Sequence, residues 1–309
     1  MKFTVMGAGG VGGYFGARLA AAGHEVGFVA RGRHLEAMRE NGLAVRSELG
    51  DVELWPVRAS DDPAAFGAAD CVLFTVKSYD CETAAEALRP ALEVDTFVVP
   101  LLNGIGHVEV LQRVLGPDRV LGGVAHISAL IEGPGVVRHF DRLQILRIGE
   151  MDNAASPRVL ALREACTAAG IECPVPRDIE RELWQKVVMI CTLAGANCLT
   201  RLPLGPCRSN PATRAMMECL IAESVAVARS LGVSLPDDQE ARTMAVLDKL
   251  PAPMKASIFA ALERGDRLEA SALNGAIDRL GREARVDTPT HRAVYAALAP
   301  HEHGTPPAA

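Results

Sequence analysis

The sequence predicts an α/β protein, in which a Rossmann-type, doubly wound sheet domain is followed by an all-α C-terminal domain. A glycine-rich turn, Gly7-x-Gly9-x-x-Gly12, lies between an apolar strand and a helix. Strand and helix patterns then alternate through the first half of the 309 residues, as in βαβ units. From Asp178 on, helical periodicity replaces almost every strand signal.

The glycine turn near the N-terminus predicts a dinucleotide-binding site. Residues 3–6 form the apolar strand that leads into the turn, and a helix is expected to start near Val11. In this context Gly7 allows the tight turn, Gly9 lets the main chain approach a pyrophosphate, and Gly12 lets the helix lie close to the strand. The free N–H groups and the positive dipole end of the helix then face the phosphates. The predicted cofactor-binding residues of the turn are Gly7, Gly9, Gly10, Val11 and Gly12.

The second strand indicates which dinucleotide binds. Its apolar run, residues 26–30, ends on Arg31, and Arg33 follows without an acidic residue. NAD-preferring sites usually place Asp or Glu there for the ribose 2′-hydroxyl, whereas Arg suits the 2′-phosphate of NADP. The alternative is that both arginines are solvated loop residues. We interpret Arg31 as an NADP(H) contact.

The remaining elements of the first half support a parallel sheet. Residues 71–76 form a continuous apolar run, as expected of a strand that is covered on both faces. A hairpin is expected over residues 43–57, around Gly50-Asp51. The other expected elements are a helix over 80–92, a strand over 96–100, and β structure at the sheet edge over 120–129 and in the pair 135–140 and 143–148.

The second half predicts a helical domain. Helices are expected over residues 179–198, 212–231, 237–249, 254–263, 269–284 and 290–298, with Pro- and Gly-containing breaks between several of them. Residues 171–177, with two prolines, indicate a linker. The predicted division is therefore an NADP-binding domain over 1–175, a helical substrate and catalytic domain over 176–300, and a disordered tail over 301–309. We expect the chemistry in a cleft between the two domains.

Composition and charge exclude several classes of protein. The formal charge of −6, without a block of like charges, argues against a general nucleic-acid binder. The longest apolar stretch, residues 187–199, is shorter than the roughly 20 residues of a membrane span. Because Met1 leads almost directly into the first strand, no signal peptide is expected. We expect a soluble, cytoplasmic protein, and the apolar helices after Asn210 either pack internally or form a homodimer interface.

The eight cysteines show neither a disulfide pattern nor a metal-binding pattern. No Cys-x-x-Cys pair occurs, and no His lies at ligand spacing from a Cys. We expect reduced, mostly buried thiols and no metal site.

Four polar residues are candidates for the chemistry. Lys77 and Asn103 each follow a predicted strand, and ligands of open parallel sheets bind outside the carboxyl ends of the strands. Each also has a purely structural interpretation: Lys77 would be a solvated surface lysine, and Asn103 would be a turn residue. Lys186 enters the apolar run of a helix, where it either snorkels or serves as a proton donor with a tunable pKa. Glu269, near Asn274, is expected at a helix start, where it would also complement the helix dipole.

Several motifs occur in order along nearly the whole chain. They are the glycine turn, the arginine that ends strand two, Thr75-Val-Lys77, Leu102-Asn103-Gly-Ile-Gly106, Glu182-Leu-Trp-Gln-Lys186, Leu199-Thr-Arg-Leu-Pro-Leu-Gly205, and Glu269 with Asn274-Gly275. Together they resemble the ketopantoate reductase (2-dehydropantoate 2-reductase) family. The resemblance implies reduction of the 2-dehydropantoate ketone by NADPH to give pantoate, a precursor of pantothenate and coenzyme A.

The resemblance also implies a role for individual residues. Lys186 would donate the proton to the ketone oxygen, and Glu269 would hydrogen-bond the substrate hydroxyl. Asn103 would help to hold the substrate and the nicotinamide, and Lys77 would lie at the edge shared by cofactor and substrate. Ser257 matches the family's serine for the substrate carboxylate.

One position departs from the family pattern. Ile190 stands one turn after Lys186, where the family pattern has a substrate-binding Asn. Asn197 is a loose counterpart and a candidate substrate-binding residue, but it would lie about 16 Å from Lys186 along an unbroken helix and so cannot simply replace the missing amide. The departure keeps two alternatives open. One is an NADPH-dependent reductase of another small branched 2-keto acid or an imine, and the other is a non-catalytic NADP-binding sensor.

Overall fold

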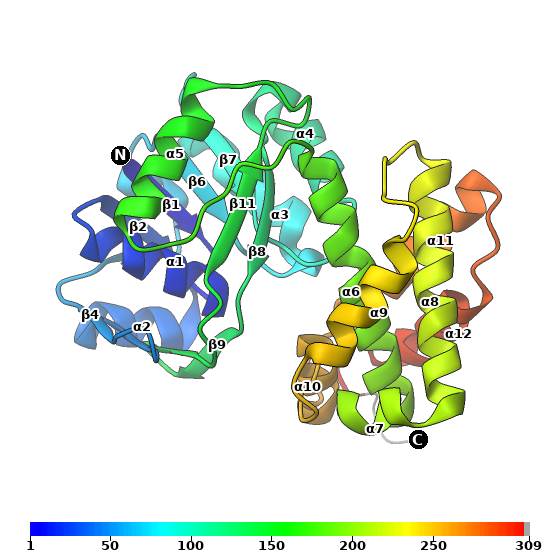
Figure 1. The fold of residues 1–309 in the computed structure, drawn as a ribbon. Coiled ribbons are helices and arrows are strands. Elements are labelled where there is room, and N and C mark those ends of the chain that lie inside the picture. The colour runs from blue at the N-terminus through cyan, green and yellow to red at the C-terminus, as the bar shows by residue number, and fades with distance from the viewer. Residues whose placement is uncertain (306–309) are drawn as a thin grey trace. The chain divides into compact units, whose positions relative to one another are not determined.

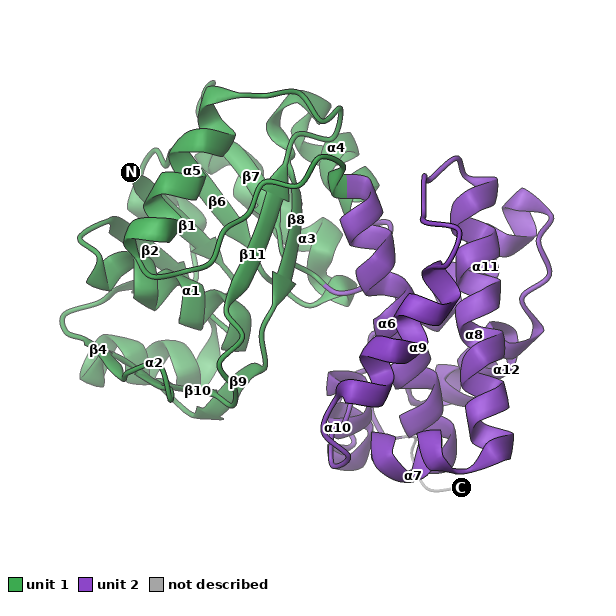
Figure 2. Cartoon of the chain, in the orientation of Figure 1, with its two compact units in different colours: residues 1–102, 107–179 green, residues 103–106, 180–309 purple. Residues whose placement is uncertain are grey.

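The computed structural model describes residues 1–305, which form two compact units (Figure 2). The first unit comprises Met1–Leu102 and His107–Ile179. The second comprises Asn103–Gly106 and the residues from Glu180 on. The short segment Asn103–Gly106 thus groups with the helical unit although both of its neighbours along the chain belong to the first.

The first unit is built on a parallel five-stranded sheet (Figure 1). Its strands lie in the order β5 (Arg58–Ser60), β2 (Glu25–Val29), β1 (Lys2–Met6), β6 (Cys71–Phe74) and β7 (Phe97–Pro100). The five helices of this unit are α1 (Gly10–Ala21), α2 (Gly32–Asn41), α3 (Cys81–Leu88), α4 (His107–Leu115) and α5 (Pro157–Ala168). The predicted Rossmann-type fold is confirmed.

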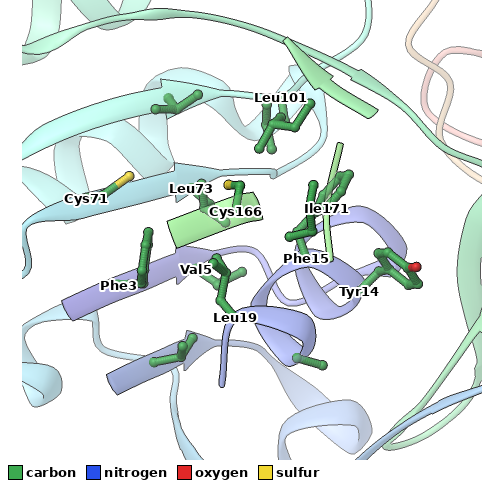
Figure 3. Close-up of a cluster of buried hydrophobic side chains, with 14 of the residues drawn as sticks. Phe3, Val5, Tyr14, Phe15, Leu19, Cys71, Leu73, Leu101, Cys166 and Ile171 are labelled. Atoms are coloured by element: carbon green, nitrogen blue, oxygen red, sulfur yellow. The ribbon is translucent and has the colours of Figure 1, made fainter. Parts of the chain in front are cut away.

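Side chains on both faces of this sheet are buried. Phe3, Val5 and Leu73 point into a core that α1 and α5 complete with Phe15 and Cys166 (Figure 3). The alternate residues of the same strands, among them Met6, Val72 and Phe74, are also buried. Because successive side chains of a strand point to opposite faces, helices must cover both faces. This explains the continuous apolar run that predicted β6.

Two smaller sheets complete the first unit, and one of them corrects a predicted pairing. The predicted hairpin is confirmed, with β3 (Leu43–Arg46) antiparallel to β4 (Val52–Leu54). The segments at 135–140 and 143–148 are strands, β10 (Val136–His139) and β11 (Ile145–Gly149), but they do not pair with each other. Instead β10 lies between β3 and β9 (Ala129–Gly133), and β11 pairs with β8 (Gly122–His126). Alternation along a sequence predicts a strand but does not specify its partner.

The second unit is helical, as predicted. Its helices are α6 (Ile179–Thr200), α7 (Leu204–Ser209), α8 (Pro211–Ser230), α9 (Gln239–Lys249), α10 (Ser257–Arg264), α11 (Asn274–Ala284) and α12 (Pro289–Leu298). The helix α7 falls within a segment that we predicted as a break, and α11 begins five residues later than predicted. The late start of α11 matters because it leaves Glu269 outside the helix.

Two predicted irregular segments are ordered in the structure. At the linker, Ile171 and Cys173 are buried in the first unit, and Glu172 pairs with the main chain of Gln144 and Leu146. The prediction of a disordered tail is wrong for residues 301–305, because Glu302 accepts hydrogen bonds from the N–H groups of Leu268 and Ser271. Residues 306–309 lie outside the described residues. The predicted domain boundary between residues 175 and 176 stays a prediction.

The described cysteines are free thiols, and all but Cys219 are buried, as expected. Within residues 1–305, no helix has the length and apolar character that crossing a membrane requires. The predicted cytoplasmic location stays a prediction.

Candidate functional site

The glycine turn joins β1 to α1 through contacts that only glycine permits. Gly7 has a positive φ of 104°. Its N–H and that of Ala8 donate to the carbonyl of Val29, at 3.2 and 2.8 Å, which ties the turn to the end of β2. A side chain at position 12 would collide with Thr75 Oγ1, and Thr75 Oγ1 itself donates to the carbonyl of Gly7 at 2.7 Å. The close packing of α1 on the sheet therefore depends on Gly12.

The surroundings of Gly9 fit a phosphate group. Gly9 is the N-cap residue of α1, and a Cβ atom built on it would have no other atom within 4 Å. Gly10 differs, because a Cβ there would collide with the main chain of Ala129 and Leu130 in β9. At the start of α1, other parts of the protein therefore fill the space beside Gly10, whereas the space beside Gly9 is empty. Helix N–H groups beside open space form a suitable cradle for the pyrophosphate of a dinucleotide.

The carboxyl ends of β2 and β6 carry the two predicted basic cofactor contacts. Arg31 lies two residues after the end of β2 as the N-cap residue of α2, and its side chain is two-thirds exposed. Its Nη1 atom lies 3.9 Å from Oδ2 of Asp80. Lys77 follows β6 and is exposed, at the start of the turn that leads to Asp80. The parallel sheet thus places the glycine turn, Arg31 and Lys77 at the ends of three neighbouring strands.

In the second unit, Lys186 lies in the first half of α6 between buried and half-buried neighbours. Trp184 and Val187 belong to the core, and Lys186 itself is half-buried. Burial lowers the pKa of Lys186 to about 8, and the nearby Glu269 carboxylate acts in the opposite direction. Desolvation disfavours the charged ammonium, whereas an opposite charge favours it. A lysine in this balance can give up a proton near neutral pH.

Glu269 lies in the segment before α11 rather than in its first turn. The residue is buried, with 6% of its surface exposed. Its carbonyl accepts from the N–H of Leu273, and the carbonyl of Ala270 accepts from the N–H of Gly275. Because Asn274 is the first residue of α11, the Glu269 carboxylate is outside the turn in which helix-dipole effects are strongest. The structure therefore favours an interaction of Glu269 with Lys186 over the alternative that Glu269 complements the dipole of α11.

The turn that carries Asn103 packs against the same segment of the second unit. Gly104 has a φ of 90°, and any side chain on it would collide with the carbonyl of Ala272. That carbonyl also accepts a hydrogen bond from the N–H of Ile105, at 3.3 Å. Ala272 lies between Glu269 and Asn274 in the sequence. Asn103, Glu269 and Lys186 thus belong to the same unit, in which the Asn103 turn contacts the segment that carries Glu269.

A buried polar network fixes the start of α11 onto α6. The side-chain amide of Asn274 donates to the carbonyl of Cys191, at 3.1 Å, and to Nδ1 of His291, at 3.0 Å. The other ring nitrogen of His291 lies 2.8 Å from Ser224 Oγ and 2.9 Å from the carbonyl of Leu220. Burial lowers the pKa of His291 and favours the neutral ring, which can accept from Asn274. We did not predict this role for His291, because one His in an apolar helix gives no signal in a sequence.

Asn197 has a structural role that the sequence did not indicate. Its Nδ2 atom donates to the carbonyl of Leu202 at 2.9 Å, and its Oδ1 atom accepts from the N–H of Ala256 at 2.8 Å. The side chain is fully buried. The geometry therefore does not favour the predicted contact between Asn197 and the substrate. Instead Asn197 anchors the residue before Ser257, which is exposed at the start of α10.

Comparisons with known proteins cover both units. The family model "Ketopantoate reductase PanE/ApbA" matches residues 3–153, and its C-terminal counterpart matches residues 178–302. A 2-dehydropantoate 2-reductase of Mesorhizobium japonicum is 34% identical, over 96% of this chain and 97% of the relative. The uncharacterized oxidoreductase YkpB of Bacillus subtilis is 31% identical, over 98% of this chain and 99% of the relative. The crystal structure of a PanE/ApbA family ketopantoate reductase from Ralstonia eutropha JMP134 has a TM-score of 0.90 and 34% identity, covering 98% of each chain.

The two glycines allow packing and ligand binding to be separated by mutation. Gly12→Ala should destabilise the protein by about 1–3 kcal/mol, because the added methyl group has no room. Gly9→Ala should leave stability nearly unchanged but weaken dinucleotide binding at least tenfold, because its methyl group would occupy the open space. Urea denaturation and calorimetric titration with NADP⁺ measure the two effects. Unchanged nucleotide affinity in Gly9→Ala would contradict the assignment of the cradle.

Proposed function

Because this chain belongs to the ketopantoate reductase family, we propose that it reduces 2-dehydropantoate to pantoate with NADPH. The family makes the chain an oxidoreductase. The observation that carries the specific proposal is the proximity of the half-buried Lys186 to the buried Glu269, whose segment contacts the turn that carries Asn103. A ketone reductase requires a proton donor of this kind.

The proposal assigns cofactor binding to the first unit. The glycine turn, with open space at Gly9, would hold the pyrophosphate, and Lys77 would contact the dinucleotide at the end of β6. Arg31, exposed after β2, supports NADPH because a guanidinium suits the 2′-phosphate. When bound, the nicotinamide supplies the hydride that reaches the ketone carbon.

Lys186 would supply the proton in this reaction. Hydride addition builds negative charge on the ketone oxygen, and a nearby ammonium both stabilises that charge and completes the alcohol. With a pKa of about 8, Lys186 is still mostly protonated at pH 7 but is a stronger acid than an ordinary lysine. A proton donor works best when its pKa lies near the working pH.

The neighbours of Lys186 would orient the substrate. The Glu269 carboxylate favours the charged form of Lys186 and would accept a hydrogen bond from the substrate hydroxyl. The Asn103 amide would help to hold the substrate and the nicotinamide. The Ser257 hydroxyl would donate to the substrate carboxylate, from a helix start that Asn197 anchors through Ala256.

One observation favours a second candidate. Ile190 lies one helical turn from Lys186 and is half-buried against the core of the second unit. An apolar side chain there suits a branched 2-keto acid without a hydroxyl group, or an imine, better than it suits 2-dehydropantoate. A non-catalytic NADP-binding sensor has less support, because Lys186, Glu269 and Asn103 are all retained. The homodimer stays a prediction.

We expect the proton donor to show in the pH profile of kcat/KM for ketone reduction. Lys186→Ala should lower kcat/KM by about 10²–10⁴-fold. In the wild type, kcat/KM should decline as pH rises through about 8, because deprotonated Lys186 cannot donate. Glu269→Gln removes the charge that raises this pKa, so the decline should move to lower pH. If Lys186→Ala retained the wild-type rate and profile, Lys186 would not be the donor.

The nucleotide preference provides a separate test. Arg31→Ala should weaken NADPH binding about tenfold or more and change NADH binding little, because a charge-assisted bond to phosphate is worth about 1.5–3 kcal/mol. Arg39→Ala is the matched control, since Arg39 is an exposed arginine of α2 that pairs with Asp61. Dissociation constants from nicotinamide fluorescence measure the effect. Equal losses for both nucleotides would refute the role of Arg31.

The identity of the substrate can be tested by ranking 2-keto acids by their kcat/KM values. We expect 2-dehydropantoate to rank above branched 2-keto acids that lack its hydroxyl group, with Glu269→Gln narrowing the difference. A higher rank for the apolar keto acids would favour the second candidate, and Ile190→Asn should then shift the ranking toward 2-dehydropantoate. Tight NADPH binding without turnover of any keto acid or imine would indicate the sensor.

A further inference from the structure

An acidic side chain lies beside Arg31, which follows β2, although the sequence places no acidic residue next to this arginine. The carboxylate of Asp80 comes from the turn Ser78–Asp80, which follows β6. Its Oδ2 atom is 3.9 Å from Nη1 of Arg31. In the sheet, only β1 separates β2 from β6, and all three strands are parallel. Their carboxyl ends therefore lie at one edge, which brings together residues 49 positions apart.

The pair is accessible to a ligand. The side chain of Arg31 is 66% exposed and that of Asp80 is 34% exposed. Ion pairs this exposed contribute little to stability, because water and salt screen them. Arg31 can therefore exchange Asp80 for a phosphate group at small cost. Asp80 is the N-cap residue of α3, and this main-chain position keeps its carboxylate near any phosphate group that Arg31 binds.

We propose that Asp80 is a specificity-determining residue that reduces the preference for NADPH over NADH. This inference rests on the proposed function, in which Arg31 binds the 2′-phosphate. A carboxylate next to that phosphate repels it, and so offsets part of the attraction that Arg31 exerts. With NADH the same carboxylate accepts a hydrogen bond from the ribose 2′-hydroxyl, the role that an acid after the second strand has in NAD-binding folds.

If Asp80 instead supported phosphate binding, removing it would change the NADPH affinity in the opposite direction. If Asp80 mainly oriented Arg31 for the phosphate, its removal would weaken NADPH binding. If it repels the phosphate, its removal strengthens NADPH binding and weakens NADH binding. The sign of the change therefore separates the two roles.

The test measures dissociation constants of NADPH and NADH by fluorescence titration, without substrate. For Asp80→Asn we expect three- to tenfold tighter NADPH and at least twofold weaker NADH, given the screening at an exposed site. The NADPH change should shrink at high salt. Asp61→Asn is the matched control, because Asp61 is an exposed acid of the same unit that lies 3.7 Å from Arg39. It should change neither constant by more than twofold.

Three outcomes would overturn the inference while leaving the proposed function intact. They are weaker NADPH binding in Asp80→Asn, equal changes for both nucleotides, and an equal shift in Asp61→Asn. A wild-type protein that binds neither nucleotide would overturn the proposed function itself, and with it the role of Asp80.

Discussion

The parallel alignment of β1 with β2 and β6 is the constraint on which the candidate cofactor site depends. Parallel strands end at the same edge, so each connection that leaves them begins next to the others. The glycine turn, Arg31 and the segment from Lys77 to Asp80 are these connections. The alignment requires α1 to pack closely on β1, which Gly12 permits and Thr75 reinforces through its bond to the Gly7 carbonyl.

A different balance operates around Lys186. Burial lowers the pKa of its ammonium group, and the charge of Glu269 partly restores it. Either influence alone would give a worse proton donor, because full desolvation would leave the amine neutral and an exposed ion pair would leave it an ordinary, weakly acidic lysine. The packing that maintains this balance includes the His291 network, which fixes Asn274 to α6 by bonds between buried groups.

The sequence was least informative where a residue or a strand depends on partners that are distant along the chain. Glu269 was expected at a helix start, but α11 begins only at Asn274, and the acid is buried in the preceding segment. Asn197 was a loose counterpart of the family's substrate-binding Asn, and its amide hydrogen-bonds main-chain groups of Leu202 and Ala256, which does not favour a contact with the substrate. The strands β10 and β11 were recognised as strands, but their partners were not, because alternation fixes which face is buried and not which strand lies alongside.

The sequence by itself determined the glycine turn, the helical second half and the candidate residues Lys77, Asn103 and Lys186. Each of these features can be recognised from residues that are close together in the sequence, since a strand, a turn and a helix follow one another without interruption. Only the tertiary structure decided that the Asn103 turn packs on the segment of Glu269, and that Asp80 lies beside Arg31. Both are contacts between segments far apart along the chain. Such contacts are set by how strands align and helices pack, and no local pattern in the sequence records them.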